Sequence, residues 1–229
     1  MKKTFLFLAI GVTALAAKWT VDDVLTAEHA GDMQISRDGK LALWTKASMD
    51  KEKGEAVSNL VLRYLDSDYD VQLTRGTDTN NSPRFSPDGK RLAFLSSRKP
   101  QSPAAASQSA APAPEGSQVW IIDVRGGEPW AATKFERGVR AVAWLDNDTL
   151  LLAAPEDSSL HDQKTKERKD TSMVVDDEEH APPVRLFRYD LKHSLATRLT
   201  DNPDRIERIA VSPDGAWAVT THDQPPVYL

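Results

Sequence analysis

Short runs of apolar and β-branched residues alternate along this chain with clusters of Gly, Pro, Asp and Ser. Runs of this kind, bounded by turn-forming residues, predict β-strands. The runs come in pairs around a recurring tetrapeptide. Its copies are Ser36-Arg37-Asp38-Gly39, Ser86-Pro87-Asp88-Gly89 and Ser212-Pro213-Asp214-Gly215, with a degenerate copy at Leu145-Asp146-Asn147-Asp148.

The tetrapeptide has the composition of a type I β-turn. A Ser in the first position can hydrogen-bond to nearby backbone, and a Pro in the second already has the required φ. Asp tolerates the third position, and Gly accepts the positive φ that follows. We therefore predict a β-hairpin at each copy.

Two further residue types keep a nearly fixed distance from the turns. An Asp closes the next strand-like run in each unit, and a Thr follows it. From that Thr to the Asp of the next turn there are 14, 13 and 14 residues. The closing residues are Asp66, Asp123 and Asp190, and the Thr residues are Thr74, Thr133 and Thr200. The repeating unit is four short strands, which is the size of a β-propeller blade.

We expect an all-β fold in which residues 32–229 form an incomplete propeller of about three and a half blades. The predicted blades are residues 32–76, 82–135, 139–200 and an incomplete 206–229. Insertions at 99–117 and 156–183 separate the second and third strands of two blades. Both should emerge on the face opposite the Ser-Pro-Asp-Gly turns. A propeller closes with four to eight blades, so we expect further blades to be missing from this sequence.

Two segments precede the first predicted blade. Residues 1–17 have a basic start at Lys2 and Lys3, a short apolar run and small residues at the end, which together predict a signal peptide cut near Ala16-Ala17. Secretion or a periplasmic location follows, with no membrane association after cleavage. Residues 18–31 should contain a short helix or strap, because Thr20 and Asp23 have capping-box spacing and Trp19 and Val24 occupy the hydrophobic-staple positions.

The composition excludes several classes of function. The formal net charge is −5, or −7 without the two lysines of the leader, and no basic patch is present. Nucleic acid is therefore not an expected partner. The chain has no cysteine, which rules out disulfides and a lipid-modified cysteine.

The sequence offers no catalytic, cofactor-binding or metal-binding residue that we can assign. A Gly-x-Ser-x-Gly nucleophile motif is absent, and the five histidines lack metal-ligand spacing. The run Asp176-Asp177-Glu178-Glu179-His180 could bind a cation or a substrate amino group, although a solvated acidic loop is the preferred interpretation. Four tryptophans fall on predicted strands, where we expect packing between blades: Trp44, Trp120, Trp144 and Trp217.

At residues 73–77, 82–96, 123–129 and 181–186 the sequence resembles the propeller of secreted bacterial prolyl oligopeptidase-family serine peptidases, of the acylaminoacyl-peptidase and dipeptidyl-peptidase-like branches. The resemblance implies a seven- or eight-bladed propeller before an α/β-hydrolase domain that carries the catalytic Ser, Asp and His. It also implies short peptides as substrates. None of the catalytic residues has a matching position here, so the chain alone should be inactive. Arg37 and the turn at 145–148 depart from the family's turn pattern.

The sequence therefore predicts the substrate-gating propeller of an exported serine peptidase, partnered by an α/β-hydrolase domain outside this chain and using no cofactor. The alternative is a non-enzymatic periplasmic propeller that acts as a binding or scaffold module. A propeller glycosidase is weakly supported, because no strand offers a convincing pair of inward carboxylates.

Overall fold

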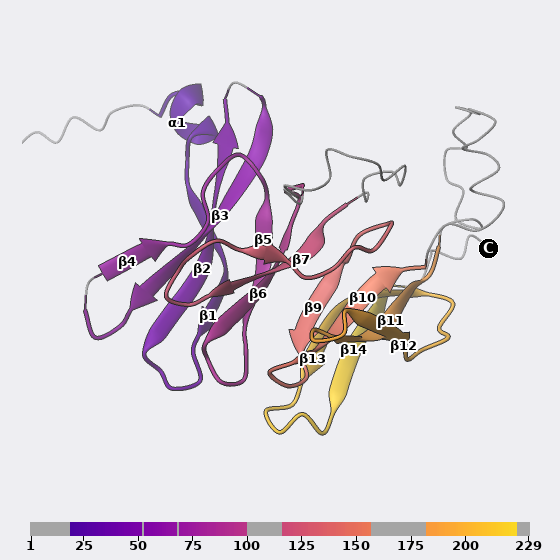
Figure 1. The fold of residues 1–229 in the computed structure, drawn as a ribbon. Helices are drawn as coiled ribbons and strands as arrows, with labels where there is room; N and C mark the ends of the chain where they lie inside the picture. Colours follow the sequence, from indigo (N-terminus) through magenta and orange to yellow (C-terminus); the bar gives the residue numbers. More distant parts are fainter. Residues whose placement is uncertain (1–18, 52, 68, 100–115, 157–181, 224–229) are drawn as a thin grey trace, which may run out of the picture.

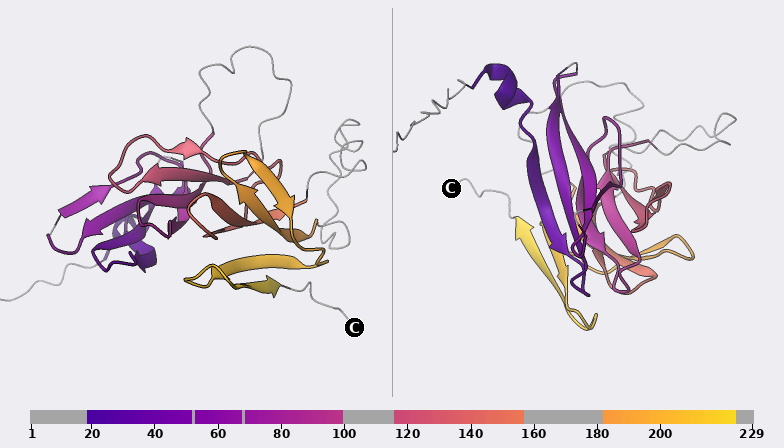
Figure 2. Two further views of the ribbon diagram at one scale, coloured as in Figure 1. Left: turned by 60° about the horizontal axis from the view of Figure 1, so that its bottom comes forward. Right: turned by 90° about the vertical axis from the view of Figure 1, so that its left-hand side faces the viewer.

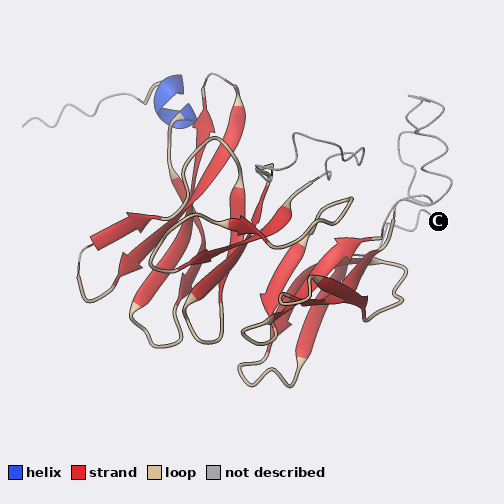
Figure 3. Cartoon of the chain, in the orientation of Figure 1, coloured by secondary structure: helices blue, strands red, loops and turns tan. Residues whose placement is uncertain are grey.

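The computed structural model describes residues 19–51, 53–67, 69–99, 116–156 and 182–223. Within them the regular secondary structure is β-strand apart from one short helix (Figures 1 and 3), and the all-β class is confirmed. The predicted leader, most of both insertions and the acidic run at 176–180 lie outside the described residues.

Two four-stranded antiparallel sheets follow one another along the chain. The first has the order β1 (His29–Ile35), β2 (Leu41–Asp50), β3 (Glu55–Tyr64) and β4 (Tyr69–Gln72). The second has the order β5 (Asn80–Phe85), β6 (Arg91–Ser96), β7 (Gln118–Asp123) and β8 (Trp130–Ala131). Strands adjacent in sequence are adjacent in the sheet, so each predicted unit is a simple meander.

The third unit contains β9 (Ala141–Trp144), β10 (Thr149–Pro155), β11 (Val184–Asp190) and β12 (Leu195–Arg198). The fourth predicted unit contributes a hairpin, β13 (Arg205–Val211) and β14 (Ala218–Asp223). One parallel pair, Val184 with Arg205, joins this hairpin to the third sheet. Otherwise the hairpin packs against this sheet as a further layer, which is visible in Figure 2.

The hydrophobic core lies between neighbouring sheets rather than within any one of them. Leu43 and Leu60 of the first sheet pack with Phe94 and Trp120 of the second. A second cluster joins the second and third sheets, and a third joins the third sheet to β13. Each large apolar side chain buried in this way contributes about 1.5–3 kcal/mol. The sheets are therefore stable only as a stack.

The recurring tetrapeptide forms the predicted turn. Ser36 Oγ lies 2.6 Å from Asp38 Oδ1 and accepts the Leu41 N–H at 2.9 Å, while Gly39 has φ 71°. The same bonds recur in the turns that begin at Ser86 and Ser212. The serine hydroxyl in each turn donates to the aspartate and lowers its pKa. The predicted turn is confirmed at all three sites.

The regular spacing of the threonines also has a physical cause. Thr74 Oγ1 accepts the Leu60 N–H at 2.9 Å, just beyond the point where β4 stops pairing with β3. Thr133 accepts from Val119 N at 2.9 Å, and Thr200 accepts from the corresponding amide of β11 at 3.0 Å. Each threonine thus extends the ladder by one hydrogen bond from a side chain.

The predicted N-terminal helix forms, and three of the four tryptophans lie on strands as predicted. Helix α1 (Val21–Leu25) carries the capping box between Thr20 and Asp23, but Trp19 and Val24 are largely exposed, so no buried staple forms. Trp120 and Trp144 are buried between sheets and Trp44 is half-buried. The prediction for Trp217 is wrong: it precedes β14 and is 75% exposed.

The threonine bonds can be tested by replacing Thr74, which is 2% exposed, with valine. Thr74→Val keeps the shape but leaves the buried Leu60 N–H without its acceptor, which should cost about 1–3 kcal/mol. Urea unfolding gives the change in free energy. Thr221→Val, on an exposed strand position, is the control and should have little effect. Equal losses in the two variants would contradict the assigned role.

The outward faces of the first and last units predict the behaviour of residues 18–229 in solution. Met33 and Ile35 in β1 are 70% and 65% exposed, and Trp217 and Val219 are 75% and 66% exposed. Apolar surface of this kind promotes association. We expect sedimentation velocity to show self-association or partial unfolding, which Trp217→Arg combined with Val219→Glu should reduce.

The control for this experiment is Leu195→Glu, which changes an exposed residue of β12 at the rim and should leave the association unchanged. A monodisperse monomer with a single sharp unfolding transition would show that these sheets need no further partner.

Candidate functional site

The first strand of every unit lies on the same side of the assembly. Strands β1 and β5 contact one another, as do β5 and β9, and β9 and β13. Each of these strands precedes the turn of its unit and pairs with one strand only within the unit. In the described residues the second edge of β1, β5 and β9 is unpaired, whereas β13 also pairs with β11. We call these four first strands the inner strands.

Two of these inner strands are interrupted at corresponding places. Register shifts occur between Gly31 and Gln34 in β1 and between Asn81 and Arg84 in β5, and β13 has a shift nearer its start, between Ile206 and Arg208. Asp32 and Ser82, four residues before the serine of the turn, have φ 48° and 50°. Non-glycine residues are uncommon in this region, and bulges often redirect side chains next to functional sites.

Around the bulges, polar side chains connect the first and second sheets. Asp32 Oδ2 accepts the Ser82 N–H at 3.0 Å, and Gln34 Nε2 donates to the carbonyl of Pro83 at 2.6 Å. Arg84 Nη1 donates to the same carbonyl at 2.8 Å. We call Asp32, Gln34, Ser82 and Arg84 the inner-strand cluster. Its members come from two units and only the fold brings them together.

The cluster holds one cation and one anion. Burial lowers the pKa of Arg84, and the carboxylate of Asp32 acts in the opposite direction. Arginine still remains charged at any physiological pH. The backbone carbonyl of Arg84 accepts a hydrogen bond from Trp144 Nε1 at 2.9 Å, which ties the third unit to the second. The cluster can therefore bind polar or charged groups, but it offers no nucleophile paired with a base.

The histidines do not form a metal centre in the described residues, where no group of three metal-type side chains occurs. His161 and His180 lie outside those residues. His29 begins β1 and is exposed. His193 lies 3.0 Å from Asp190 and lowers the pKa of that carboxyl to about 2.

His222 forms a chain of contacts that sequence reasoning missed. Its Nδ1 lies 2.8 Å from Asp204 Oδ1, and its Nε2 lies 2.8 Å from Thr220 Oγ1. The order resembles an acid–histidine–hydroxyl triad, yet Thr220 lies within β14 and not on a sharp strand-to-helix turn. Lys46 and Glu28 form an ion pair at the corresponding place in the first unit. The contact therefore joins the ends of a hairpin.

Comparison with known proteins adds a relative and several structures, while no family model matches. Over 214 residues the chain is 26% identical to a protein of Bacillus subtilis (strain 168) named the uncharacterized peptidase YuxL. The match covers 87% of this chain and 30% of that protein, so the chain spans less than a third of its relative.

Two solved structures show the same fold at low identity. An acylaminoacyl peptidase from Pyrococcus horikoshii is 14% identical, with a TM-score of 0.53 over 80% of this chain and 26% of that one. A putative TolB from Agrobacterium tumefaciens is 20% identical, with a TM-score of 0.53 over 87% of this chain and 60% of that one. Four-stranded meanders that fan out with their first strands together are the units of a propeller.

The sheets are β-propeller blades. The predicted resemblance to peptidase propellers is confirmed, since the curated relative is a peptidase and a peptidase of known structure shares the fold. The blades in the described residues form an open set and no closed sheet.

The inner-strand cluster predicts a measurable effect of one carboxylate on the joint between the first two blades. Asp32→Ala removes the acceptor of the Ser82 N–H and the anion beside Arg84, and should lower the free energy of unfolding by about 0.5–1.5 kcal/mol. Asp66→Ala, in the exposed turn after β3, is the control. If urea unfolding gives the two variants the same free energy of unfolding, Asp32 does not stabilise the contact between the first two blades.

Proposed function

We propose that this chain contributes the gating propeller of an exported serine peptidase. The observation that carries the proposal is the 214-residue match to a protein named as a peptidase. An acylaminoacyl peptidase among the solved structures supports it through the shared fold. The chain spans only 30% of the curated relative, so the activity of the whole protein is part of the proposal.

In this proposal the chemistry belongs to an α/β-hydrolase domain outside the present sequence. The 229 residues contain no Gly-x-Ser-x-Gly motif for a nucleophile, and in the inner-strand cluster Asp32 accepts the backbone N–H of Ser82. The propeller would act by excluding folded proteins and admitting short peptides. Asp32 and Arg84 would meet such peptides if, as in a closed propeller, the inner strands faced a central channel.

Export is the second part of the proposal. Residues 1–17 have the three regions of a secretory signal peptide, and the chain has no cysteine. In the described residues, no helix is long and apolar enough to cross a bilayer. Fractionation of cells should place the protein in the periplasm or the medium, with its N-terminus at residue 17 or 18.

The decisive experiment expresses the whole gene product, from the initiating methionine to the stop codon, beside residues 18–229. A fluorophosphonate should label the whole product at a serine, and the product should hydrolyse short peptides but not folded proteins. Residues 18–229 should neither label nor hydrolyse, because they lack the nucleophile motif. Labelling of residues 18–229, or no labelling of the whole product, would overturn the proposal.

If the whole gene product is not labelled, the result would favour the alternative, a non-enzymatic propeller that binds or organises partners. A fold shared with a putative TolB is compatible with that function, since the same fold can carry unrelated activities. The two proposals therefore differ in one observable, a reactive serine in the whole gene product.

A further inference from the structure

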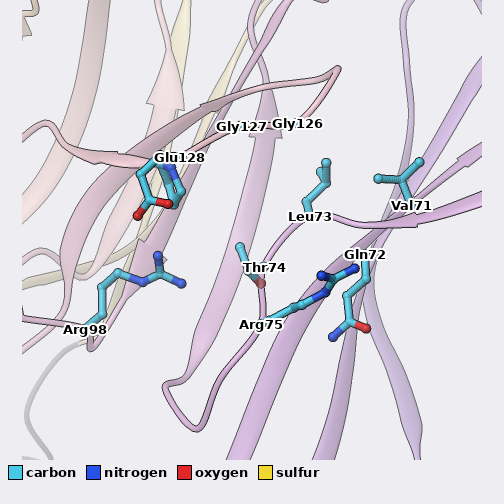
Figure 4. Close-up of a pocket in the computed structure, with 10 residues that line it drawn as sticks. Val71, Gln72, Leu73, Thr74, Arg75, Arg98, Gly126, Gly127 and Glu128 are labelled. Atoms are coloured by element: carbon cyan, nitrogen blue, oxygen red, sulfur yellow. The ribbon is translucent and has the colours of Figure 1, made fainter.

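A cleft of about 430 Å³ opens at the outer rim between the first and second blades (Figure 4). It is bordered by the segment after β4, by the end of β6 and by the turn between β7 and β8. Three charged side chains line it: Arg75, Arg98 and Glu128. In Figure 4, Arg98 and Glu128 lie on one side of the cleft and Arg75 on the other.

The guanidinium of Arg98 stacks on a tryptophan and has no ion-pair partner among the described residues. Its carbon lies 5.1 Å from the centre of the Trp120 ring, so the cation stacks on a side chain that is only 5% exposed. Its Nε is buried and has no hydrogen-bond partner in the described residues. Neither Arg98 nor Arg75 forms an ion pair with a described residue. A guanidinium held over an aromatic ring at the edge of a cleft can still bind an anionic group that enters the cleft.

The third blade provides an internal comparison. The strand pairing places Glu156 after β10 where Arg98 follows β6. Glu156 has two partners, Arg185 at 2.7 Å and Arg198 at 2.6 Å. The corresponding charge in the second blade has none among the described residues. The position is thus neutralised within the chain in one blade and left charged beside a cleft in the other.

A second rim cleft of similar size provides a comparison. The cleft between the second and third blades has a volume of about 420 Å³ and is lined by Lys134, Phe135, Tyr189 and small residues. Tyr189 donates its hydroxyl to the carbonyl of Ala132 at 2.6 Å. That cleft has no guanidinium and no carboxylate among its lining residues. The paired charges between the first two blades are therefore not shared by the neighbouring cleft.

We propose that the cleft between the first two blades binds a small amino carboxylate, of the size of an amino acid or dipeptide. Arg98 would take the carboxylate, because a guanidinium offers two parallel donors to it. Glu128 would take the ammonium group, and Arg75 would add positive charge from the other side of the cleft. The volume suits a ligand of this size. The proposal does not depend on peptidase activity.

The test is calorimetric titration of the whole gene product, treated first with fluorophosphonate so that no peptidase can consume the probe. Alanylalanine should bind saturably, whereas its C-terminal amide and its N-acetyl form should bind more weakly. Arg98→Gln should weaken the binding of alanylalanine at least about tenfold. Arg98→Gln should not further weaken the binding of the C-terminal amide, because the amide already lacks the carboxylate that Arg98 would contact. Glu128→Gln should likewise weaken the binding of alanylalanine, and it should not further weaken the binding of the N-acetyl form, which lacks the ammonium group.

Two variants keep the result interpretable. Arg125→Gln changes an arginine on the same turn that is 83% exposed and paired with Asp123, and it should bind normally. If Arg98→Gln does not fold, Arg98→Lys replaces it in the test. Arg98→Lys keeps the positive charge but loses the paired donors, so it should bind alanylalanine more weakly than the native protein. Free alanine tested beside the dipeptide decides which of the two sizes is bound.

The absence of saturable binding would overturn the proposal. So would an amide that binds as tightly as the free dipeptide, or an equal loss in Arg125→Gln. None of these outcomes bears on labelling by fluorophosphonate, so this site and the proposed peptidase function fail separately.

Discussion

Each four-stranded sheet in this protein has two apolar faces and can bury them only against the sheets before and after it. In β6, Leu92 and Phe94 belong to the cluster shared with the first blade, whereas Ala93 and Leu95 belong to the cluster shared with the third. Successive residues of a strand point to opposite faces, so this run is apolar throughout. Contact between blades is therefore the source of the core, and every other feature depends on it.

The polar residues complete hydrogen bonds where the backbone ladders end. Threonines at the end of the fourth strand accept amide protons that no strand can reach, and the serine–aspartate pairs close the turns. Asn80 is 1% exposed and bonds to Ser58 of the first blade and to Ser96 of its own blade. These bonds fix the register and the joints of a stack whose apolar contacts are not directional.

The same stacking creates the two surfaces that can interact with other molecules. At the inside, bulges in β1 and β5 place Asp32 and Ser82 against one another across the joint of two blades. At the outside, the blades separate and leave clefts at the rim. The fold alone does not choose a function for either surface, since a peptidase and a TolB-like protein share it. The choice lies in the side chains that line each surface.

The sequence by itself determined the local structure, because turns and strand ends depend on residues close together in the chain. The Ser-Pro-Asp-Gly turn, the threonine spacing and the Thr20–Asp23 capping box could all be predicted from residue type and separation. The apolar strands likewise indicated blades and the packing of Trp120 and Trp144 between them.

Only the tertiary structure decided which distant residues meet. Asp32 and Ser82, His222 and Asp204, and Arg75 and Arg98 are brought together by the stacking of blades and by strand register, which no local pattern encodes. Burial was decided in the same way. The sequence around Trp217 predicts a strand residue that packs between blades. The side chain is nevertheless 75% exposed, because no blade in the described residues covers that face. The position of a residue along its strand determines which face of the sheet its side chain points to, and the neighbouring sheet decides whether that side chain is buried.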